Sequence, residues 1–247
     1  MTIFLNKSLL ITRPMHESLV FSQQIKKFNL SINTICNPLF EIENLPVDLD
    51  LSDTSGLLIT SSNAIRSLIQ SKVFFKGSMF CVGNSTALLA KEAGFHSVSA
   101  NGNISHLVRL ITRLEPKNVK KLVYCRGEEI TGDLGGLLRE KNYNVHEEVC
   151  YKKVPRNLSL ETIDRLNKGL IVGATFFSKQ TVDLFFNQVR YIPNGFIAFC
   201  ISKAVSDTVL SFYSQSFLSI RVAEEPSMIE MCKLVVNAPE LVTWHSS

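Results

Sequence analysis

Short apolar runs alternate along the chain with segments in which apolar residues recur at every third or fourth position. The runs are rich in Leu, Ile, Val and Phe with little polar alternation, which is typical of strands buried on both faces of a sheet. They lie at 8–12, 57–60, 79–82, 121–125, 170–177 and 196–201. Amphipathic helices are predicted at 16–28, 63–71, 85–93, 103–114, 132–142 and 179–187. The alternation predicts parallel sheets with right-handed crossovers, and helix stops are expected at Gly94 and near Asn142.

Several of these runs occur twice, in the same order and with slowly growing spacing. A strand-like run ending in Arg, a run turning into Ser before a helix, and a third run before Gly or Ser each have a second copy. The pairs are residues 9–13 with 122–126, 57–65 with 174–182, and 80–83 with 199–202. The repeats predict two similar βα-rich lobes with a groove between them, and the groove is the expected place for chemistry.

Two stretches differ from the rest of the pattern. Residues 34–43 and 145–154 look extended and mixed in polarity, and each follows the first βα of its copy. We expect them to form the connection between the lobes. The tail from Ala238 to Ser247 is polar apart from Trp244, and a frayed end is expected there.

The composition narrows the class of protein. The 247 residues are 45% hydrophobic and 19% charged, with a formal net charge of +4. This is a globular composition whose positive excess is too weak to indicate nucleic acid, but it is compatible with a polyanionic small molecule. No apolar run approaches the roughly 18 residues needed to cross a bilayer, and there is no signal-peptide pattern, so a cytoplasmic protein without membrane association is expected.

The cysteines and histidines do not indicate a metal site. The six cysteines have no C-x-x-C spacing and sit mostly in apolar runs, so buried, reduced thiols are expected. The five histidines are scattered, without H-E-x-x-H spacing. There is also no G-x-G-x-x-G or Walker A loop, so nucleotide binding has no positive support.

Two arginines end predicted strands, where ligands of open α/β sheets bind. Arg13 precedes Pro14, which fits the first position of a helix, and Arg126 precedes Gly127. A guanidinium there can fork onto a carboxylate. An equally good interpretation is that each arginine pairs with a nearby acid and fixes a loop.

Other strand-to-helix turns carry hydroxyls, amides and small residues. They contain Ser61, Ser62 and Asn63; Gly83 and Thr86; Ser178 and Lys179; and Ser202 and Lys203. Such turns cap helices, and they can also cradle an anion with free N–H groups; the two interpretations are compatible. Tyr151 is the most interesting proton donor, although it could equally be a half-buried interface tyrosine with a solvated hydroxyl.

The order of these motifs resembles the uroporphyrinogen-III synthase family. The resemblance covers residues 7–236 and rests on Leu10–Pro14, Leu58–Arg66, Cys81–Ala87, Ala93–Phe95, Leu122–Glu128, Val149–Tyr151, Phe177–Gln180 and Glu225–Ser227. It implies an α/β fold of two flavodoxin-like, parallel-sheet lobes joined by a two-stranded β-ladder. One lobe would comprise residues 1–36 plus 154–247 and the other 40–149, with 37–39 and 150–153 as the interlobe connections.

The resemblance also implies a reaction. Hydroxymethylbilane, a linear tetrapyrrole with eight carboxylates, would be closed to uroporphyrinogen III with loss of water and inversion of ring D. No metal or organic cofactor is implied. The pyrrole chain can expel hydroxide through its own nitrogen electrons, so the enzyme would mainly bend the chain, hold its ends together and exclude water. A transient hand-over from the preceding enzyme of the pathway and a monomeric state are further expectations.

The family's site carries over residue by residue. Tyr151 corresponds to a tyrosine proposed to assist departure of the hydroxyl. The predicted substrate-binding residues are Arg13, Ser61, Ser62, Asn63, Arg66, Gly83, Thr86, Arg126, Gly127, Ser178, Lys179, Ser202 and Lys203. The turn at Ser202–Ala204 departs from the family's Gly and Thr, so its role stays open. The alternative function is a non-catalytic two-lobed binding protein for an anionic small molecule.

Overall fold

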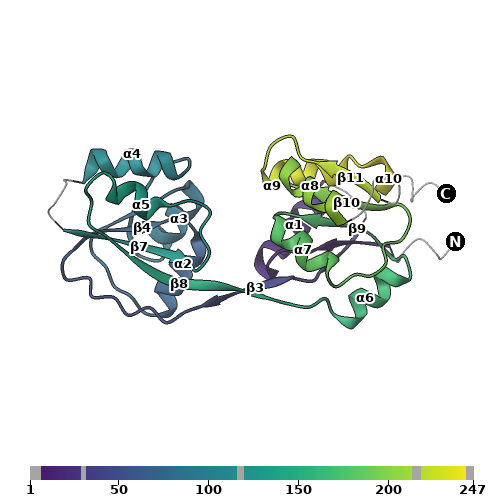
Figure 1. Cartoon of the computed structure of the whole chain (residues 1–247), viewed down its shortest axis with the longest axis horizontal. Coiled ribbons are helices and arrows are strands. Elements are labelled where there is room, and N and C mark those ends of the chain that lie inside the picture. Colours follow the sequence, from purple (N-terminus) through teal and green to yellow (C-terminus); the bar gives the residue numbers. More distant parts are fainter. Residues whose placement is uncertain (1–6, 29–31, 116–119, 213–217, 243–247) are drawn as a thin grey trace. The chain divides into compact units, whose positions relative to one another are not determined.

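The computed structural model describes residues 7–28, 32–115, 120–212 and 218–242 (Figure 1). The chain divides into two compact units. Unit 1 comprises Met1–Glu41 and Pro155–Ser247, and unit 2 comprises Ile42–Val154. Each unit is built on one sheet with helices on both faces, so the predicted α/β class with parallel sheets is confirmed.

The described part of unit 1 contains a five-stranded parallel sheet. Its strands are β1 (Ser8–Ile11), β2 (Asn33–Cys36), β9 (Ile171–Phe176), β10 (Phe196–Cys200) and β11 (Leu218–Val222), in the order β11-β10-β9-β1-β2. This is the flavodoxin-like order, in which the direction of strand addition reverses between β1 and β9. Ligands of such sheets bind beyond the carboxyl ends of the strands at that reversal.

Helices cover both faces of this sheet. They are α1 (Met15–Lys27), α6 (Leu160–Asn167), α7 (Lys179–Phe186), α8 (Lys203–Phe212), α9 (Met228–Val236) and α10 (Pro239–Val242). Helices α6, α7 and α8 pack on one face through Leu166, Phe185 and Val209. On the other face α1 and α9 pack through Phe21 and Met231. Both faces of the central strands are therefore buried, which explains their continuous apolar sequences.

Unit 2 contains the second sheet. Among the described residues its strands are β3 (Phe40–Asn44), β4 (Thr54–Ile59), β5 (Ser78–Cys81), β6 (His96–Ser99), β7 (Lys121–Gly127) and β8 (Val145–Pro155), in the order β3-β8-β7-β4-β5-β6. The strands from β8 to β6 pair in parallel. The mixed-polarity stretch 34–43 contains most of β2 and of β3, and the stretch 145–154 lies within β8. Strands β3 and β8 each cross a boundary between the units.

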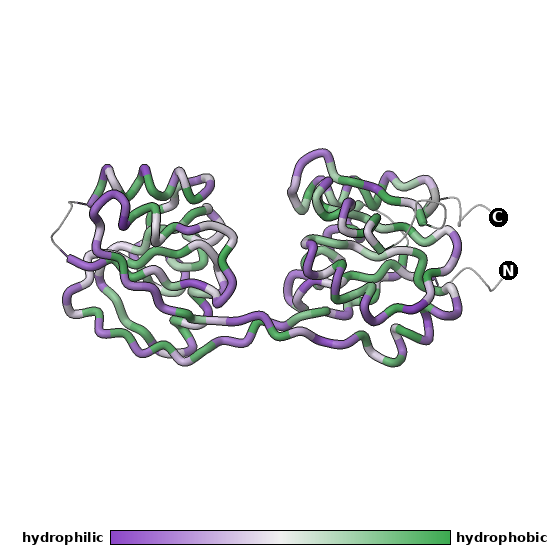
Figure 2. Tube along the Cα trace, in the orientation of Figure 1, coloured by the Kyte–Doolittle hydropathy of each residue, from purple (hydrophilic) through white to green (hydrophobic). Residues whose placement is uncertain are grey.

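Two pairs of helices cover the sheet of unit 2. They are α2 (Ser62–Gln70) with α3 (Asn84–Glu92), and α4 (Ile104–Leu114) with α5 (Leu134–Arg139). Helices α2 and α3 pack on the face that carries Ile59 and Cys125. Helices α4 and α5 pack on the face that carries Leu58 and Tyr124. Figure 2 shows that the central strands of both units carry mainly hydrophobic residues, while hydrophilic residues occur in the connections and along the helices.

The sequence repeats occupy equivalent places in the two sheets. Strands β1, β9 and β10 of unit 1 carry the sequences that recur in β7, β4 and β5 of unit 2. Within their sheets the orders β2-β1-β9-β10-β11 and β8-β7-β4-β5-β6 therefore correspond strand by strand. The equivalent central pairs are β1 with β9 and β7 with β4, although the chain visits them in a different order.

All of the predicted strands and helices named above are present, with ends shifted by a few residues. The expected stops have positive φ at Gly94 and Asn142. Two details were wrong. Pro14 is the N-cap of α1 rather than its first helical residue. The tail is not frayed from Ala238 onward, because Pro239–Val242 forms α10 and Leu241 is buried in the core; Trp244 lies outside the described residues.

Other features bear on the class of protein. No helix in the described ranges is long and apolar enough to cross a membrane. All six cysteines lie in those ranges; five are buried and Cys36 is half-buried. No group of three or more His, Cys, Asp or Glu side chains in this part of the chain could hold a metal ion.

The close packing of β9 on β10 makes a testable prediction at Gly173. An added Cβ would lie 2.6 Å from the carbonyl oxygen of Ile197. Gly173→Ala should therefore lower the free energy of unfolding by about 1–3 kcal/mol, because the strands must separate. Gly83→Ala is the comparison variant, since its φ is −121° and nothing lies within 4 Å of its Cβ position. Its cost should be limited to the poorer N-cap that Ala gives α3. Equal unfolding midpoints in urea for both variants would contradict this explanation.

Candidate active site

A hollow lies at the carboxyl edge of the sheet of unit 2. Three segments form most of it: the end of β4, the end of β7 with the loop that follows, and the middle of β8. Its lining residues are Thr60, Ser61, Ile104, Tyr124, Gly127, Glu128, Glu129, Ile130, Thr131, Gly132, Tyr151, Lys152 and Lys153. Strands β4 and β7 are the central pair, so the hollow sits where open α/β sheets bind ligands. We call residues 127–132 the lining loop.

Tyr151 lies against the start of the lining loop. Gly127 is its register partner across β7 and β8, and the N–H of Glu128 donates to the carbonyl of Tyr151 at 2.9 Å. A Cβ on Gly127 would come within 2.8 Å of the Tyr151 ring and 3.0 Å of its hydroxyl oxygen. Gly127 is therefore needed so that the ring can lie against the backbone, where Tyr151 stays half-buried on the hollow.

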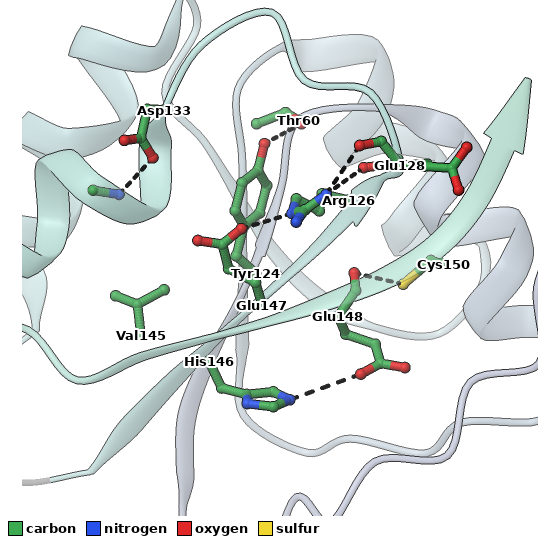
Figure 3. Close-up of polar contacts among 12 residues, drawn as sticks. Thr60, Tyr124, Arg126, Glu128, Asp133, Val145, His146, Glu147, Glu148 and Cys150 are labelled. Atoms are coloured by element: carbon green, nitrogen blue, oxygen red, sulfur yellow. Dashed lines mark hydrogen bonds and ion pairs between the residues drawn. The ribbon is translucent and has the colours of Figure 1, made fainter.

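A second tyrosine faces the hollow from β7. The hydroxyls of Tyr124 and Thr60 are 3.1 Å apart and share a hydrogen bond (Figure 3). Burial raises the pKa of the Tyr124 phenol, and the neighbouring Tyr151 acts in the same direction, while the hydrogen bond with Thr60 opposes the shift. Tyr124 therefore stays protonated at neutral pH, and it can donate a hydrogen bond into the hollow or to Thr60.

Arg126 is engaged by protein groups on the α4 and α5 face. Its Nε lies 2.6 Å from Oε2 of Glu147, whose other oxygen lies 2.6 Å from Nη2 of Arg139. Nη1 of Arg126 donates to the carbonyls of Gly127 at 2.9 Å and Glu128 at 3.2 Å (Figure 3). These contacts agree with the second interpretation of Arg126, in which the arginine pairs with a nearby acid and fixes a loop.

The Glu147 carboxylate is held in its charged form. Partial burial opposes ionisation, but the hydrogen bonds and charges of Arg139 and Arg126 outweigh it, so the pKa of Glu147 lies below its ordinary value. The ion pairs are therefore fully formed when the pH is above the ordinary pKa of a glutamate side chain. They are lost only as the pH falls through the lowered pKa of Glu147.

The turn after β4 holds four of the predicted residues. Ser61 is the N-cap of α2 and its Oγ accepts from the N–H of Asn63 at 3.2 Å. Nη1 of Arg66 donates to Ser62 Oγ at 3.2 Å and to Asn63 Oδ1 at 3.0 Å. Arg66 thus folds back along its own helix toward the turn, while Ser61 lines the hollow.

The turn after β5 and the first turn of α3 hold two further predicted residues, Gly83 and Thr86. Gly83 is the N-cap of α3, with open space at its Cβ position and an ordinary φ, and Thr86 is buried in the first turn. Neither lines the hollow around Tyr151. An adjoining hollow reaches toward this turn through Val82 and shares Thr60, Ile104 and Thr131 with the first.

In unit 1, Arg13 follows β1 at the equivalent central position. Its guanidinium carbon lies 4.2 Å from the centroid of the Phe177 ring, which in turn packs edge-on against Phe21. Burial lowers the pKa of Arg13, an effect that the Glu17 charge opposes, but arginine stays charged at any relevant pH. No carboxylate in the described part of the chain forms an ion pair with Arg13. Its donors are therefore available to a ligand.

The other predicted residues of unit 1 begin two helices. Ser178 is the N-cap of α7 and accepts from the N–H of Thr181 at 3.2 Å, with exposed Lys179 next to it. Ser202 precedes α8, and its carbonyl accepts from the N–H groups of Val205 and Ser206. Lys203 is exposed and pairs with Asp207 at 2.7 Å. These residues lie at the carboxyl edge of the unit 1 sheet.

Part of this site was predictable from the sequence. Of the predicted residues, Ser61, Gly127 and Tyr151 line one hollow. Among the lining residues that were not predicted, Tyr124 lies inside an apolar run, and Lys152 and Lys153 pair with Glu43 at 3.2 Å and with Glu129 at 3.3 Å. A phenol inside an otherwise aliphatic strand next to a strand end was the available signal for Tyr124.

Comparisons with known proteins agree on one family. A family model described as uroporphyrinogen-III synthase HemD matches residues 21–233. A uroporphyrinogen-III synthase of Chlorobaculum parvum is 25% identical over 221 residues, covering 82% of this chain and 83% of that protein. Among solved structures, a uroporphyrinogen-III synthetase from Helicobacter pylori has a TM-score of 0.65 at 17% identity, covering 93% of this chain and 98% of the other.

A second solved structure is similar in fold. A mutant uroporphyrinogen III synthase from Thermus thermophilus has a TM-score of 0.51 at 14% identity, covering 96% of this chain and 99% of the other. At such low identities the two structures support the fold, whereas the family model and the Chlorobaculum sequence match this chain along most of its length.

The contact between Gly127 and Tyr151 can be tested by substitution. Gly127→Ala should lower the free energy of unfolding by about 1–3 kcal/mol, since the nearest atoms to the new Cβ all belong to the Tyr151 side chain. The same change in a Tyr151→Ala background should cost much less, because the ring is gone. Urea unfolding of the four proteins measures the coupling, and additive costs would show that the ring is not the obstacle.

Proposed function

This chain belongs to the uroporphyrinogen-III synthase family of cyclising lyases, and we propose that the hollow around Tyr151 is where the closing chemistry of hydroxymethylbilane is assisted. The reaction forms uroporphyrinogen III and releases water, with ring D inverted. The observation that carries the proposal is the phenol of Tyr151, held half-buried by Gly127 on a hollow that also contains hydroxyl groups.

The role of Tyr151 follows from the chemistry of the leaving group. Hydroxide leaves the terminal methylene as the pyrrole nitrogen electrons move toward it, so negative charge grows on the departing oxygen. A phenol O–H within reach can donate a hydrogen bond or a proton to that oxygen. The Tyr151 hydroxyl has no hydrogen-bond partner among the described residues, so it can point at a ligand without first breaking an internal bond.

The carboxylates of the substrate need cations and N–H donors. We propose that the strand-end turns supply them, since free amides at helix starts and a charged guanidinium both suit carboxylate oxygens. The proposed binding residues are Arg13, Ser61, Ser62, Asn63, Arg66, Gly83, Thr86, Arg126, Gly127, Ser178, Lys179, Ser202 and Lys203. Arg13 is the strongest candidate because its donors are not used by a carboxylate of the chain's described part. In Arg126, Nη2 remains available to a carboxylate, because it donates to no acceptor among the described residues.

The instability of the linear substrate suggests the cellular setting. Without an enzyme the bilane closes to the uninverted isomer, so a free substrate would be lost to the wrong product. We therefore propose a transient hand-over from the enzyme that produces the bilane, in the cytoplasm.

The activity itself is tested by supplying hydroxymethylbilane and separating the product isomers. The chain should yield isomer III well above the spontaneous background. A product consisting of isomer I alone, equal to that of a protein-free control, would contradict the assignment.

Tyr151→Phe tests the leaving-group role. The variant should lower kcat on the order of 100-fold, the lower range for general acid catalysis. The free energy of unfolding should change by less than about 1 kcal/mol, because no protein hydrogen bond is lost. Steady-state kinetics beside urea unfolding gives both numbers. A kcat equal to that of the wild type would remove Tyr151 from the mechanism.

Arg13→Ala tests carboxylate binding in unit 1. The variant should raise KM roughly 10-fold or more with a smaller change in kcat, since a charge-assisted contact to a carboxylate away from the reacting carbon is lost. Arg113→Ala, at an exposed arginine in the last turn of α4, is the matched control and should leave KM unchanged. Equal KM values for the two variants would exclude Arg13 from substrate binding.

A further inference from the structure

We propose that Glu147 is a positioning residue of the cyclisation, because it orients Arg126 and Arg126 fixes the lining loop against Tyr151. The proposal rests on the proposed function of the Tyr151 hollow. Glu147 lines neither hollow of this sheet edge, so it would act through its neighbours and not by touching the substrate.

The first link is the carboxylate itself. Both oxygens of Glu147 are used, Oε2 by Nε of Arg126 and Oε1 by Nη2 of Arg139, each at 2.6 Å. Arg139 is anchored as well, since its Nη1 donates to the carbonyl of Val145 at 3.2 Å. A side chain at position 135 of α5 would collide with Oε1 of Glu147. Glycine at this position therefore leaves room for the carboxylate. The carboxylate is thus fixed from two sides.

The second link runs from Arg126 to the loop backbone. With Nε turned toward Glu147, Nη1 reaches the carbonyls of two successive residues, Gly127 at 2.9 Å and Glu128 at 3.2 Å. Side chains of Arg126 and Glu147 are each about one fifth exposed, at 20% and 19%, so the pair is screened less than a surface pair. A guanidinium is a rigid fork, so fixing one edge fixes the direction of the other.

The third link joins the loop to Tyr151. The N–H of Glu128 donates to the carbonyl of Tyr151, and the Tyr151 ring lies against Gly127. A shift of the loop at residues 127 and 128 therefore moves the ring or leaves it unsupported. Displacing a catalytic group by about 1 Å can cost on the order of 100-fold in rate, so a remote carboxylate can matter for turnover.

The repeat in unit 1 provides an internal comparison. Arg13 occupies the place that corresponds to Arg126, yet it stacks on Phe177 and forms no ion pair with a carboxylate in the described part of the chain. Among the described residues, the acid-paired arrangement is therefore present in the copy that carries Tyr151 and not in the other. This difference favours a role tied to Tyr151 over a general requirement of the fold.

Glu147→Gln tests the proposal, since glutamine keeps the size of the side chain and removes its charge. We expect kcat to fall about 10- to 100-fold with a smaller change in KM, and the share of isomer I in the product to rise. Arg126→Gln should lower kcat similarly and also raise KM, since its Nη2 is a proposed carboxylate donor. The double variant should have a kcat no lower than the more damaged single variant, because both act on kcat through one link.

Two controls separate positioning from stability. Glu148→Gln changes the adjacent carboxylate, which points to the opposite side of β8 and pairs with His146 at 3.7 Å (Figure 3). Arg139→Gln removes the other partner of Glu147 without touching the loop. Glu148→Gln should keep the kcat and isomer ratio of the wild type. Arg139→Gln should lose much less kcat than Glu147→Gln, because the direct pair of Glu147 with Arg126 remains. Should Glu147→Gln fail to fold, Glu147→Asp replaces it and should show the same changes to a smaller degree.

The possible outcomes distinguish the two proposals. A wild type that produces no isomer III contradicts the proposed function and not this inference alone. If the wild type makes isomer III, wild-type kcat and isomer ratio in Glu147→Gln would overturn the positioning role. The positioning role is also overturned if Arg139→Gln loses as much kcat as Glu147→Gln and if, in both variants, the loss of kcat follows the loss of thermal stability. The carboxylate would then be only structural.

Discussion

Parallel pairing of the central strands, β1 with β9 and β7 with β4, is the constraint on which the rest of the structure depends. Parallel strands end at the same edge, so every strand-to-helix turn of a sheet meets its neighbours there. Burial of both faces requires apolar side chains along the strands, which leaves the turns as the places for polar chemistry. Arg13 and Phe177 in one sheet, and Thr60 and Gly127 in the other, are brought together in this way.

The two copies have the same strand arrangement but different chemistry at the carboxyl edge of each sheet. In unit 1 the arginine after the first strand rests on an aromatic ring with its donors available. In unit 2 the equivalent arginine is tied to Glu147 and to the loop beside Tyr151. The cyclisation of a chain with many carboxylates also has two different requirements. The carboxylates must be bound at several points, whereas the bond to the leaving group is broken at one point. Under the proposed function, one copy would bind charge and the other would orient a proton donor.

Much of the fold could be predicted because buried central strands and amphipathic helices have strong patterns. Less regular elements such as β6 and β11 were not predicted, since their short sequences mix exposed and buried residues. Ser61 and Tyr151 could be singled out as residue types at expected strand ends. The link from Glu147 to Arg126 could not, because it depends on the register of β7 and β8, which shifts between Arg126 and Gly127. Such a shift is a property of the folded pair and not of either strand alone.

The most direct test of the proposed site is to locate a bound tetrapyrrole octacarboxylate by amide NMR of the whole chain. Uroporphyrin III, the oxidised form of the product, keeps all the carboxylates. We predict that its titration shifts the amides at the carboxyl ends of the strands, including Ser62, Glu128 and Lys179. Amides at the amino ends, such as those of Ser8, Thr54 and Ile171, should stay unchanged. Shifts confined to the amino ends, with the turn amides unmoved, would contradict the central claim that the strand-end turns form the tetrapyrrole site.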